Sequence, residues 1–212
     1  MLGVILIGLD RPSRVAALAE LGIRWARWSG ARLVGLGIVD EPSVRAIEPA
    51  WPVGGTPDAD PVYYRGYEGR LTELDRQVGQ LLEQFAACCG EAGVAHVEVK
   101  AVGSPHELIE RQAHSCDLSL LARGSHFRFT RRDDEGDETL KRVLEQAPRP
   151  LVVVPGTTVS EGPVVFASDG SLQAARALAA FQATGLAKSG QVHIVSVDAS
   201  VSEAAHLAQR AR

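Results

Sequence analysis

Two aspartates at corresponding places in the chain have the side chain best suited to bind a ligand. Asp10 ends the apolar run of residues 4–9, and Asp169 ends a similar run that begins at Val164. A carboxylate at such a place can bind a ribose or a metal-bound phosphate, or it can cap the helix that follows. For Asp10 the ligand role and the capping role are both open.

A second candidate site is the segment 122–138, whose residue types suit a phosphate. Gly124, Ser125 and Gly136 would let backbone N–H groups approach an anion. Positive charge comes from Arg128, Arg131 and Arg132, and five carboxylates crowd the same segment: Asp133, Asp134, Glu135, Asp137 and Glu138. These carboxylates would repel a triphosphate unless Mg²⁺ screened them, and they also suit the start of a helix. Phosphate binding and helix initiation are therefore both open.

Motifs for several catalytic chemistries do not occur. The sequence has no Walker lysine motif, no nucleophile elbow and no HExxH. His106, His114 and Cys116 form the one candidate metal cluster, but their spacing matches no recognised ligand pattern, which favours surface or core histidines. His126 lies in segment 122–138, where it either contacts an anion or is an ordinary exposed residue. With no positioned base or nucleophile, we expect no enzymatic activity.

Short strands joined by helices must position these residues. Apolar runs predict strands at 4–10, 32–39, 96–102, 117–121 and 151–154, and helical spacing predicts helices at 14–29, from 68 onward, after Ser104 and at 139–146. Pro105 and Glu107 indicate a capping box with Ser104, and Leu140, Val143 and Leu144 should face inward. Alternating strands and helices predict an open five-stranded parallel α/β sheet, Rossmann-like, with helices on both faces.

Candidate ligand residues converge on one edge of this sheet. In open parallel sheets, ligands bind beyond the carboxyl ends of the strands, where the strand order reverses. Asp10, Val39 with Asp40, Gly103 and residues 122–125 all follow predicted strands. Their convergence carries more weight than any one of them.

Residues 41–66 break the pattern, because prolines and glycines recur there without a sustained period. We expect a long surface loop. Trp51, Tyr63 and Tyr64 lie in this segment, and Tyr67 directly follows it. They either form a lid or interface, or pack over the domain itself.

The pattern then starts again, which predicts a tandem organisation. We expect a first domain at residues 1–156, a linker at 157–162 and a partial second copy at 163–212. The second copy contains a strand from Val164, a helix at about 172–188, a strand at 192–197 and a helical piece at 203–212. Such a half leaves a sheet edge and apolar faces uncovered, which favours association with another copy.

Composition places the chain among ordinary globular proteins. The 212 residues are 45% hydrophobic and 23% charged, with a net charge of −4. No basic excess points to nucleic acid, and no apolar run approaches the ~20 residues that span a bilayer. The amino end lacks the features of a signal peptide, so we expect a cytoplasmic protein without nucleic-acid or membrane partners. Cys88, Cys89 and Cys116 are expected to be reduced packing residues.

Several motifs together resemble the universal stress protein family, and specifically its tandem-domain members. They are Ile5-Leu6-Ile7-Gly8-Leu9-Asp10, the second strand from Val34 to Asp40, Val102-Gly103-Ser104-Pro105, Asp117-Leu118-Ser119-Leu120-Leu121, Arg142-Val143-Leu144 and Ala147-Pro148-Arg149-Pro150-Leu151-Val152-Val153-Val154-Pro155. The last motif is the most specific. In the second copy, Ala167-Ser168-Asp169-Gly170-Ser171 is similar to the family's Asp-Gly-Ser opening. The resemblance covers nearly the whole chain apart from residues 41–66.

The resemblance implies a fold that pairs through its last strand, as a dimer or between tandem copies. It also implies, as in some members, that ATP binds with Mg²⁺ at the first-strand acid, the end of strand two and a glycine-rich loop after strand four. The positions that correspond here are Leu9, Asp10, Val39, Ala122, Gly124, Ser125, Gly136 and Asp137. Ala122 and Ser125 stand where the family has glycine, and Asp137 stands where it has a hydroxyl. The resemblance therefore implies weak or altered ATP binding.

The leading hypothesis from the sequence is a non-catalytic stress-response protein that acts through dimerisation or pseudo-dimerisation. Two alternatives use the same fold. One is a nucleotide hydrolase or transferase, and the other is a ligand-free structural or interaction partner.

Overall fold

The computed structural model describes residues 2–47, 61–127, 138–155, 162–186 and 191–211. The chain divides into two compact units. One unit comprises residues 3–159, and the other comprises residues 160–212 together with residues 1–2. In the described ranges, no helix is long and apolar enough to cross a membrane.

The larger unit is built on a parallel sheet of five strands, as predicted. The strands are β1 (Val4–Leu9), β2 (Arg32–Val39), β3 (His96–Val102), β4 (Leu118–Ala122) and β5 (Leu151–Val154). Their order in the sheet is β3-β2-β1-β4-β5. The chain first moves from β1 outward to β3, and it then returns to the other side of β1 to place β4 and β5. The order therefore reverses between β1 and β4, where open α/β sheets bind ligands.

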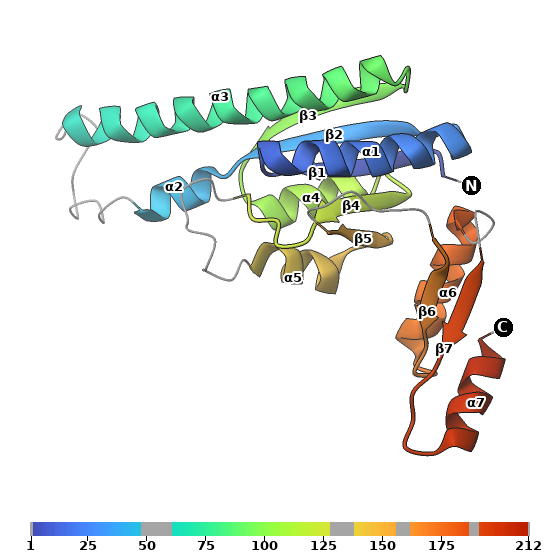
Figure 1. The fold of residues 1–212 in the computed structure, drawn as a ribbon. Coiled ribbons are helices and arrows are strands. Elements are labelled where there is room, and N and C mark those ends of the chain that lie inside the picture. Colours follow the sequence, from blue (N-terminus) through green and yellow to red (C-terminus); the bar gives the residue numbers. More distant parts are fainter. Residues whose placement is uncertain (1, 48–60, 128–137, 156–161, 187–190, 212) are drawn as a thin grey trace. The chain divides into compact units, whose positions relative to one another are not determined.

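Helices cover both faces of this sheet (Figure 1). They are α1 (Pro12–Ser29), α2 (Glu41–Ile47), α3 (Pro61–Glu91), α4 (Pro105–Ala113) and α5 (Glu138–Gln146). On one face, α1 and α3 pack side by side, with Gly22 of α1 against Ile7. On the other face, α4 and α5 bring Ile109 and Val143 onto strand residues such as Leu6. β1 and β2 are thus buried on both faces, which explains their near-continuous apolar runs.

A glycine in β2 sets how closely α3 approaches the sheet. A Cβ atom at Gly35 would lie 2.5 Å from Cδ1 of Phe85, whose ring is fully buried on α3.

Farther along the same helix, Cys89 is also buried, and burial raises the pKa of its thiol to about 11. Cys88, Cys89 and Cys116 are all free, in agreement with the prediction. They pack as small apolar side chains.

The prediction of a long loop over residues 41–66 is wrong at both ends. The helix α2 begins at Glu41, because Asp40 caps it by accepting a hydrogen bond from the backbone N–H of Ser43 at 3.2 Å. The helix α3 begins at Pro61, a residue that suits the first turn of a helix because no hydrogen bond is lost there. Tyr67 joins the two helices through a 2.6 Å hydrogen bond to Glu41. Trp51 lies outside the described residues.

Two smaller predictions also need correction. Ser104 is the N-cap of α4, but its hydroxyl pairs with Nδ1 of His106 at 2.9 Å and caps no backbone N–H. The capping box is therefore not formed. Leu144 was expected to face inward on α5, yet it is 53% exposed, whereas Val143 is buried. One residue is about 100° of helical rotation, which moves Leu144 off the buried face.

The smaller unit has the element order of the first four elements of the larger one. It contains β6 (Val164–Ala167), α6 (Leu172–Thr184), β7 (Val192–Val195) and α7 (Val201–Arg210), and β6 pairs with β7 in parallel. The pairs Val4 with Arg32 and Val164 with Val192 have the same sequence separation. In β6 and β7, half-buried residues alternate with exposed ones, including Val165 and Val195. One face of this two-stranded sheet is therefore uncovered within the unit.

Candidate functional site

The candidate site lies where β1 and β4 end side by side. Asp10 follows β1 directly, and residues 123–127 follow β4. The two strands are hydrogen-bonded neighbours, with Ile5 opposite Leu118 and Ile7 opposite Leu120. Asp10 and the segment after β4 consequently meet at the reversal of strand order, as the sequence predicted.

Asp10 is almost completely buried there, with 1% of its surface exposed. Its Oδ2 accepts a 2.7 Å charge-assisted hydrogen bond from Nη1 of Arg14 and a 3.3 Å bond from the backbone N–H of His126. The N-cap residue of α1 is Arg11, so the interpretation of Asp10 as the helix cap is not confirmed. The carboxylate ties the start of α1 to the segment after β4.

Two buried oxygen atoms at this place have no partner among the described residues. They are Oδ1 of Asp10 and Oγ of Ser125, and each residue is 1% exposed. An unsatisfied buried polar atom costs about 1–3 kcal/mol, so native structures seldom keep one without a reason such as an absent ligand. Burial raises the pKa of the Asp10 carboxyl, and the charge of Arg14 opposes this rise.

The turn after β4 is shaped by Gly124. Its φ of 70° lies in the left-handed region, which glycine adopts at little cost. The backbone N–H of Ser125 bonds to the Ala122 carbonyl at 2.9 Å, and the Gly124 carbonyl accepts a 2.9 Å bond from Arg14. Arg14 therefore holds both Asp10 and the turn.

A second arginine borders the same place. Arg11 places Nη2 against the ring nitrogen Nε2 of His126. Two arginine side chains thus converge on the residues that follow β4.

Most of the residues carried over from the resemblance gather in this region. Leu9, Asp10, Ala122, Gly124 and Ser125 all lie at the ends of β1 and β4. Val39 ends β2 on the far side of β1, and its carbonyl accepts a 3.0 Å hydrogen bond from the N–H of Gly103. Gly136 and Asp137 lie outside the described residues.

The sequence interpretation missed Arg14 and Arg11. The available signal was the spacing of Asp10 and Arg14, because opposite charges four residues apart at the start of a helix are often paired. His106, His114 and Cys116, which the sequence offered as a candidate cluster but disfavoured as a metal site, do not come together: the described part of the chain has no group of three His, Cys, Asp or Glu residues able to hold a metal ion.

In the smaller unit, the equivalent aspartate has a different environment. Asp169 is exposed, and hydrogen bonds from the side chain of Ser171 and from its backbone N–H, the latter at 2.9 Å to Oδ1, lower its pKa. Ser171 then caps α6 by accepting from the N–H of Ala174 at 3.1 Å. Asp169 thus shapes a turn, and it lacks the buried, arginine-paired environment of Asp10.

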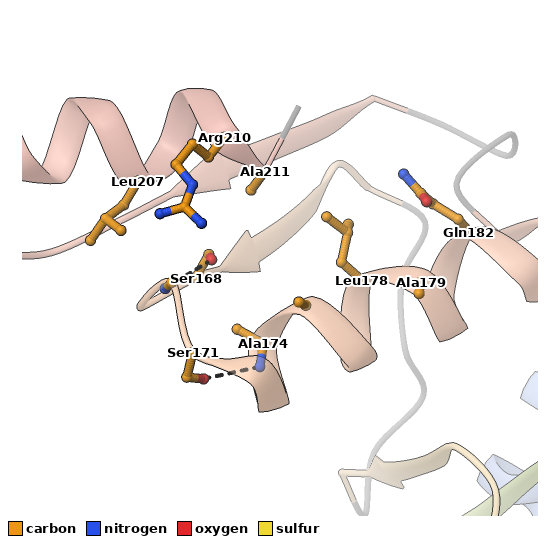
Figure 2. Close-up of a pocket in the computed structure, with 11 residues that line it drawn as sticks. Ser168, Ser171, Ala174, Leu178, Ala179, Gln182, Leu207, Arg210 and Ala211 are labelled. Carbon is orange, nitrogen blue, oxygen red and sulfur yellow. Dashed lines mark hydrogen bonds between the residues drawn. The ribbon is translucent and has the colours of Figure 1, made fainter.

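A groove of about 180 Å³ also lies between α6 and α7. Figure 2 shows Leu178 on α6 opposite Leu207 and Arg210 on α7, with Ser168 at one end of the groove. Leu207 packs against Gly170, where a Cβ atom would lie 2.5 Å from the leucine Cδ2. The hydroxyl of Ser168 already accepts from the N–H of Gly170 at 3.3 Å, so this groove does not reproduce the unpartnered atoms of the first site.

No protein-family model matches the sequence, and no curated protein matches it. Solved structures do match. Hypothetical protein MJ0577 is 16% identical with a TM-score of 0.53, over 72% of this chain and 94% of the other. The universal stress protein UspA from Lactobacillus plantarum is 22% identical with a TM-score of 0.47, over 72% and 97%. A universal stress protein in complex with cAMP is 16% identical with a TM-score of 0.46, over 74% and 98%. The similarity is one of fold, and the chain has a universal stress protein-like α/β fold.

Proposed function

We propose that this protein is a non-catalytic stress-response protein that binds an adenine nucleotide, such as ATP, where β1 and β4 end. The observation that carries the proposal is the pair of buried oxygen atoms without a partner, Oδ1 of Asp10 and Oγ of Ser125. Both lie at the reversal of strand order, where ligands bind in this class of sheet. The residue resemblance to universal stress proteins names the ligand class.

Each group has a definite role in this proposal. Oδ1 of Asp10 accepts a hydrogen bond from a ribose hydroxyl, and the Ser125 hydroxyl bonds to the ligand by donating or accepting. The positive charge at the site comes from Arg14 and Arg11, which favours a phosphate-bearing ligand. Because Ala122 and Ser125 replace glycines of the family pattern, the backbone approaches phosphate less closely, and we expect weak binding.

Calorimetric titration of the full chain with ATP tests this proposal. Asp10→Ala removes the acceptor and should weaken binding by at least about tenfold, the loss expected for one charge-assisted hydrogen bond. Asp169→Ala is the matched control, because it removes the equivalent aspartate from the smaller unit and should leave the affinity unchanged. Equal affinity of wild type and Asp10→Ala for ATP would contradict the assignment of Asp10 to the nucleotide site.

We propose further that the smaller unit is a partial repeat of the larger one and associates with another copy of the chain. The boundaries at residues 1–156, 157–162 and 163–212 follow from this view. The supporting observation is the exposed strand face, where Val165 is 63% and Val195 42% exposed. Both edges of a two-stranded sheet are also open to pairing within the unit. Such a protein would work as a homo-oligomer in the cytoplasm.

Light scattering tests the association. Val165→Lys places a charge on the exposed strand face and should shift the protein toward monomer. Leu172→Lys is the matched control, because Leu172 is equally exposed, at 63%, but lies on α6. A wild-type protein that stays monomeric at high concentration would contradict the proposed homo-oligomer.

A further inference from the structure

We propose that Arg14 is the built-in cation of this site, so that the phosphate anion binds to Arg14 without Mg²⁺. This inference rests on the proposed nucleotide site and names how that site recognises its ligand. It concerns a residue that the carried-over family pattern does not include.

The Arg14 side chain is fixed by two hydrogen bonds from a single nitrogen. Nη1 donates to Oδ2 of Asp10 at 2.7 Å and to the Gly124 carbonyl at 2.9 Å. A guanidinium carries five N–H donors, so Nη2 and Nε keep three. Among the described residues, Arg14 makes no further hydrogen bond. Its side chain is 20% exposed, which leaves part of it open to a ligand.

The orientation of Arg14 is set before any ligand arrives. The Asp10 carboxylate is buried, and the Gly124 carbonyl belongs to the turn after β4. The edge of the sheet therefore fixes the positions of both acceptors. The planar fork of an arginine matches two oxygens of a phosphate, and prior fixing of its position reduces the entropy lost on binding. Nη1 held by Asp10 and Gly124 thus leaves the rest of the fork for an anion.

The described residues do not fit Mg²⁺ at Asp10. Mg²⁺ requires oxygen ligands in a near-octahedral arrangement. Oδ2 of Asp10 is already used by Arg14 and by the N–H of His126, so a divalent ion on this oxygen would lie against the guanidinium and be repelled by it. Oδ1 stays available for a hydroxyl donor. Arg14 therefore neutralises Asp10, the role that a metal ion would otherwise have.

Titration calorimetry with ATP in two buffers tests the inference, one with Mg²⁺ and one with EDTA. For the wild-type chain, we expect the dissociation constants to agree within about twofold. Arg14→Gln should weaken binding by about tenfold or more in both buffers, because the fork and its charge are lost. Arg14→Lys keeps the charge but not the fork, so its affinity for ATP should lie between those of wild type and Arg14→Gln and should not depend on Mg²⁺. Arg111→Gln, an exposed arginine on α4, is the matched control and should bind as wild type.

The outcomes separate this inference from the proposed function. Wild-type binding that EDTA abolishes would overturn the role of Arg14 and leave the nucleotide site standing. Binding in neither buffer would overturn both. If Arg14→Gln fails to fold, as circular dichroism would show, the wild-type comparison and Arg14→Lys still decide. Affinity of Arg14→Lys and Arg14→Gln equal to that of wild type would also overturn the inference.

Discussion

Nη1 of Arg14 lies 2.7 Å from Oδ2 of Asp10, and Arg14 follows Asp10 by four residues in the sequence. Oδ1 of Asp10 has no partner in the described part of the structure. The pair therefore satisfies half of a buried carboxylate and leaves the other half unsatisfied. A site that must stay open to a ligand hydroxyl requires this arrangement.

The pH dependence of stability should report the balance at Asp10. Burial raises the pKa of Asp10 above its ordinary value of 3.8, despite the opposing charge of Arg14. Between 3.8 and the raised pKa, the folded protein binds more protons than the unfolded chain, so the free energy of unfolding falls as the pH rises. Asp10→Asn does not titrate. Its stability relative to wild type should increase with pH across this window and become constant above it.

Urea unfolding of both proteins at a series of pH values measures this difference. Asp40→Asn is a useful control, because Asp40 is also buried and follows a strand but caps α2. A relative stability of Asp10→Asn that falls as the pH rises would mean that Arg14 outweighs burial, and the sign of our pKa argument would be wrong.

Gly35 should not tolerate a side chain. Gly35→Ala places a Cβ atom within 2.5 Å of the buried Phe85 ring, so the ring or α3 must shift. We expect a loss of about 1–3 kcal/mol in the free energy of unfolding, typical of overpacked cores.

Gly79→Ala on α3 is the matched control for this change. A Cβ atom at Gly79 meets nothing within 4 Å, so the substitution should stabilise the protein by about 0.5–1 kcal/mol through the helix propensity of alanine. Equal effects of the two substitutions in urea unfolding would contradict the packing of α3 on β2.

Ser171 and Ser104, the N-caps of α6 and α4, should differ in their contribution to stability. Ser171 accepts a hydrogen bond from the N–H of Ala174, so Ser171→Ala should destabilise α6 by about 1 kcal/mol. Ser104 makes no cap hydrogen bond on α4, so Ser104→Ala should have a smaller effect. Amide hydrogen exchange in the first turn of each helix measures both, and faster exchange in α4 than in α6 after substitution would contradict this difference.

Asp117 should stabilise the start of β1. Its Oδ2 accepts hydrogen bonds from the N–H groups of Gly3 at 2.8 Å and Val4 at 2.9 Å, which lower its pKa from 3.8. Because the group is exposed, we expect Asp117→Ala to cost about 1 kcal/mol near neutral pH. The contribution is present above pH 3.8 and is lost as the pH falls through the lowered pKa.

The control for Asp117 is Asp75→Ala, which removes a surface ion pair with Lys100. Exposed pairs contribute little, so its effect should stay below about 0.5 kcal/mol. Thermal unfolding at a series of pH values from acid to pH 7 compares the two. A pH-independent loss in Asp117→Ala would mean that the carboxylate charge has no part in holding the strand.

The centre of the sheet could be predicted from the sequence because β1, β2 and β4 are buried on both faces, which requires nearly continuous apolar runs. β2, β3 and β5 have the predicted bounds. β1 ends one residue earlier than predicted, and β4 begins and ends one residue later. The sequence does not predict α2 or the start of α3, because Pro42 and Pro61 resemble helix breaks. A proline in the first turn of a helix interrupts no hydrogen bond.

The site was predicted only in part, for a physical reason. The acid after β1 and the turn after β4 could be located, because parallel strands bring their carboxyl ends to one edge. The spacing of Asp10 and Arg14 made Arg14 one candidate partner, but a side chain near a helix start has several rotamers and several partners within reach. The structure decides between them, because the Gly124 carbonyl provides a second acceptor for Arg14 beside Asp10.

Contact of a nucleotide with the ends of β1 and β4 is tested most directly by titrating ATP into the isotopically labelled chain and following the amide NMR shifts. We expect saturable shifts concentrated at Asp10, Gly124, Ser125 and His126, with Asp169 and Ser171 unchanged. Saturable shifts confined to the smaller unit, or no shift at millimolar ATP, would contradict it.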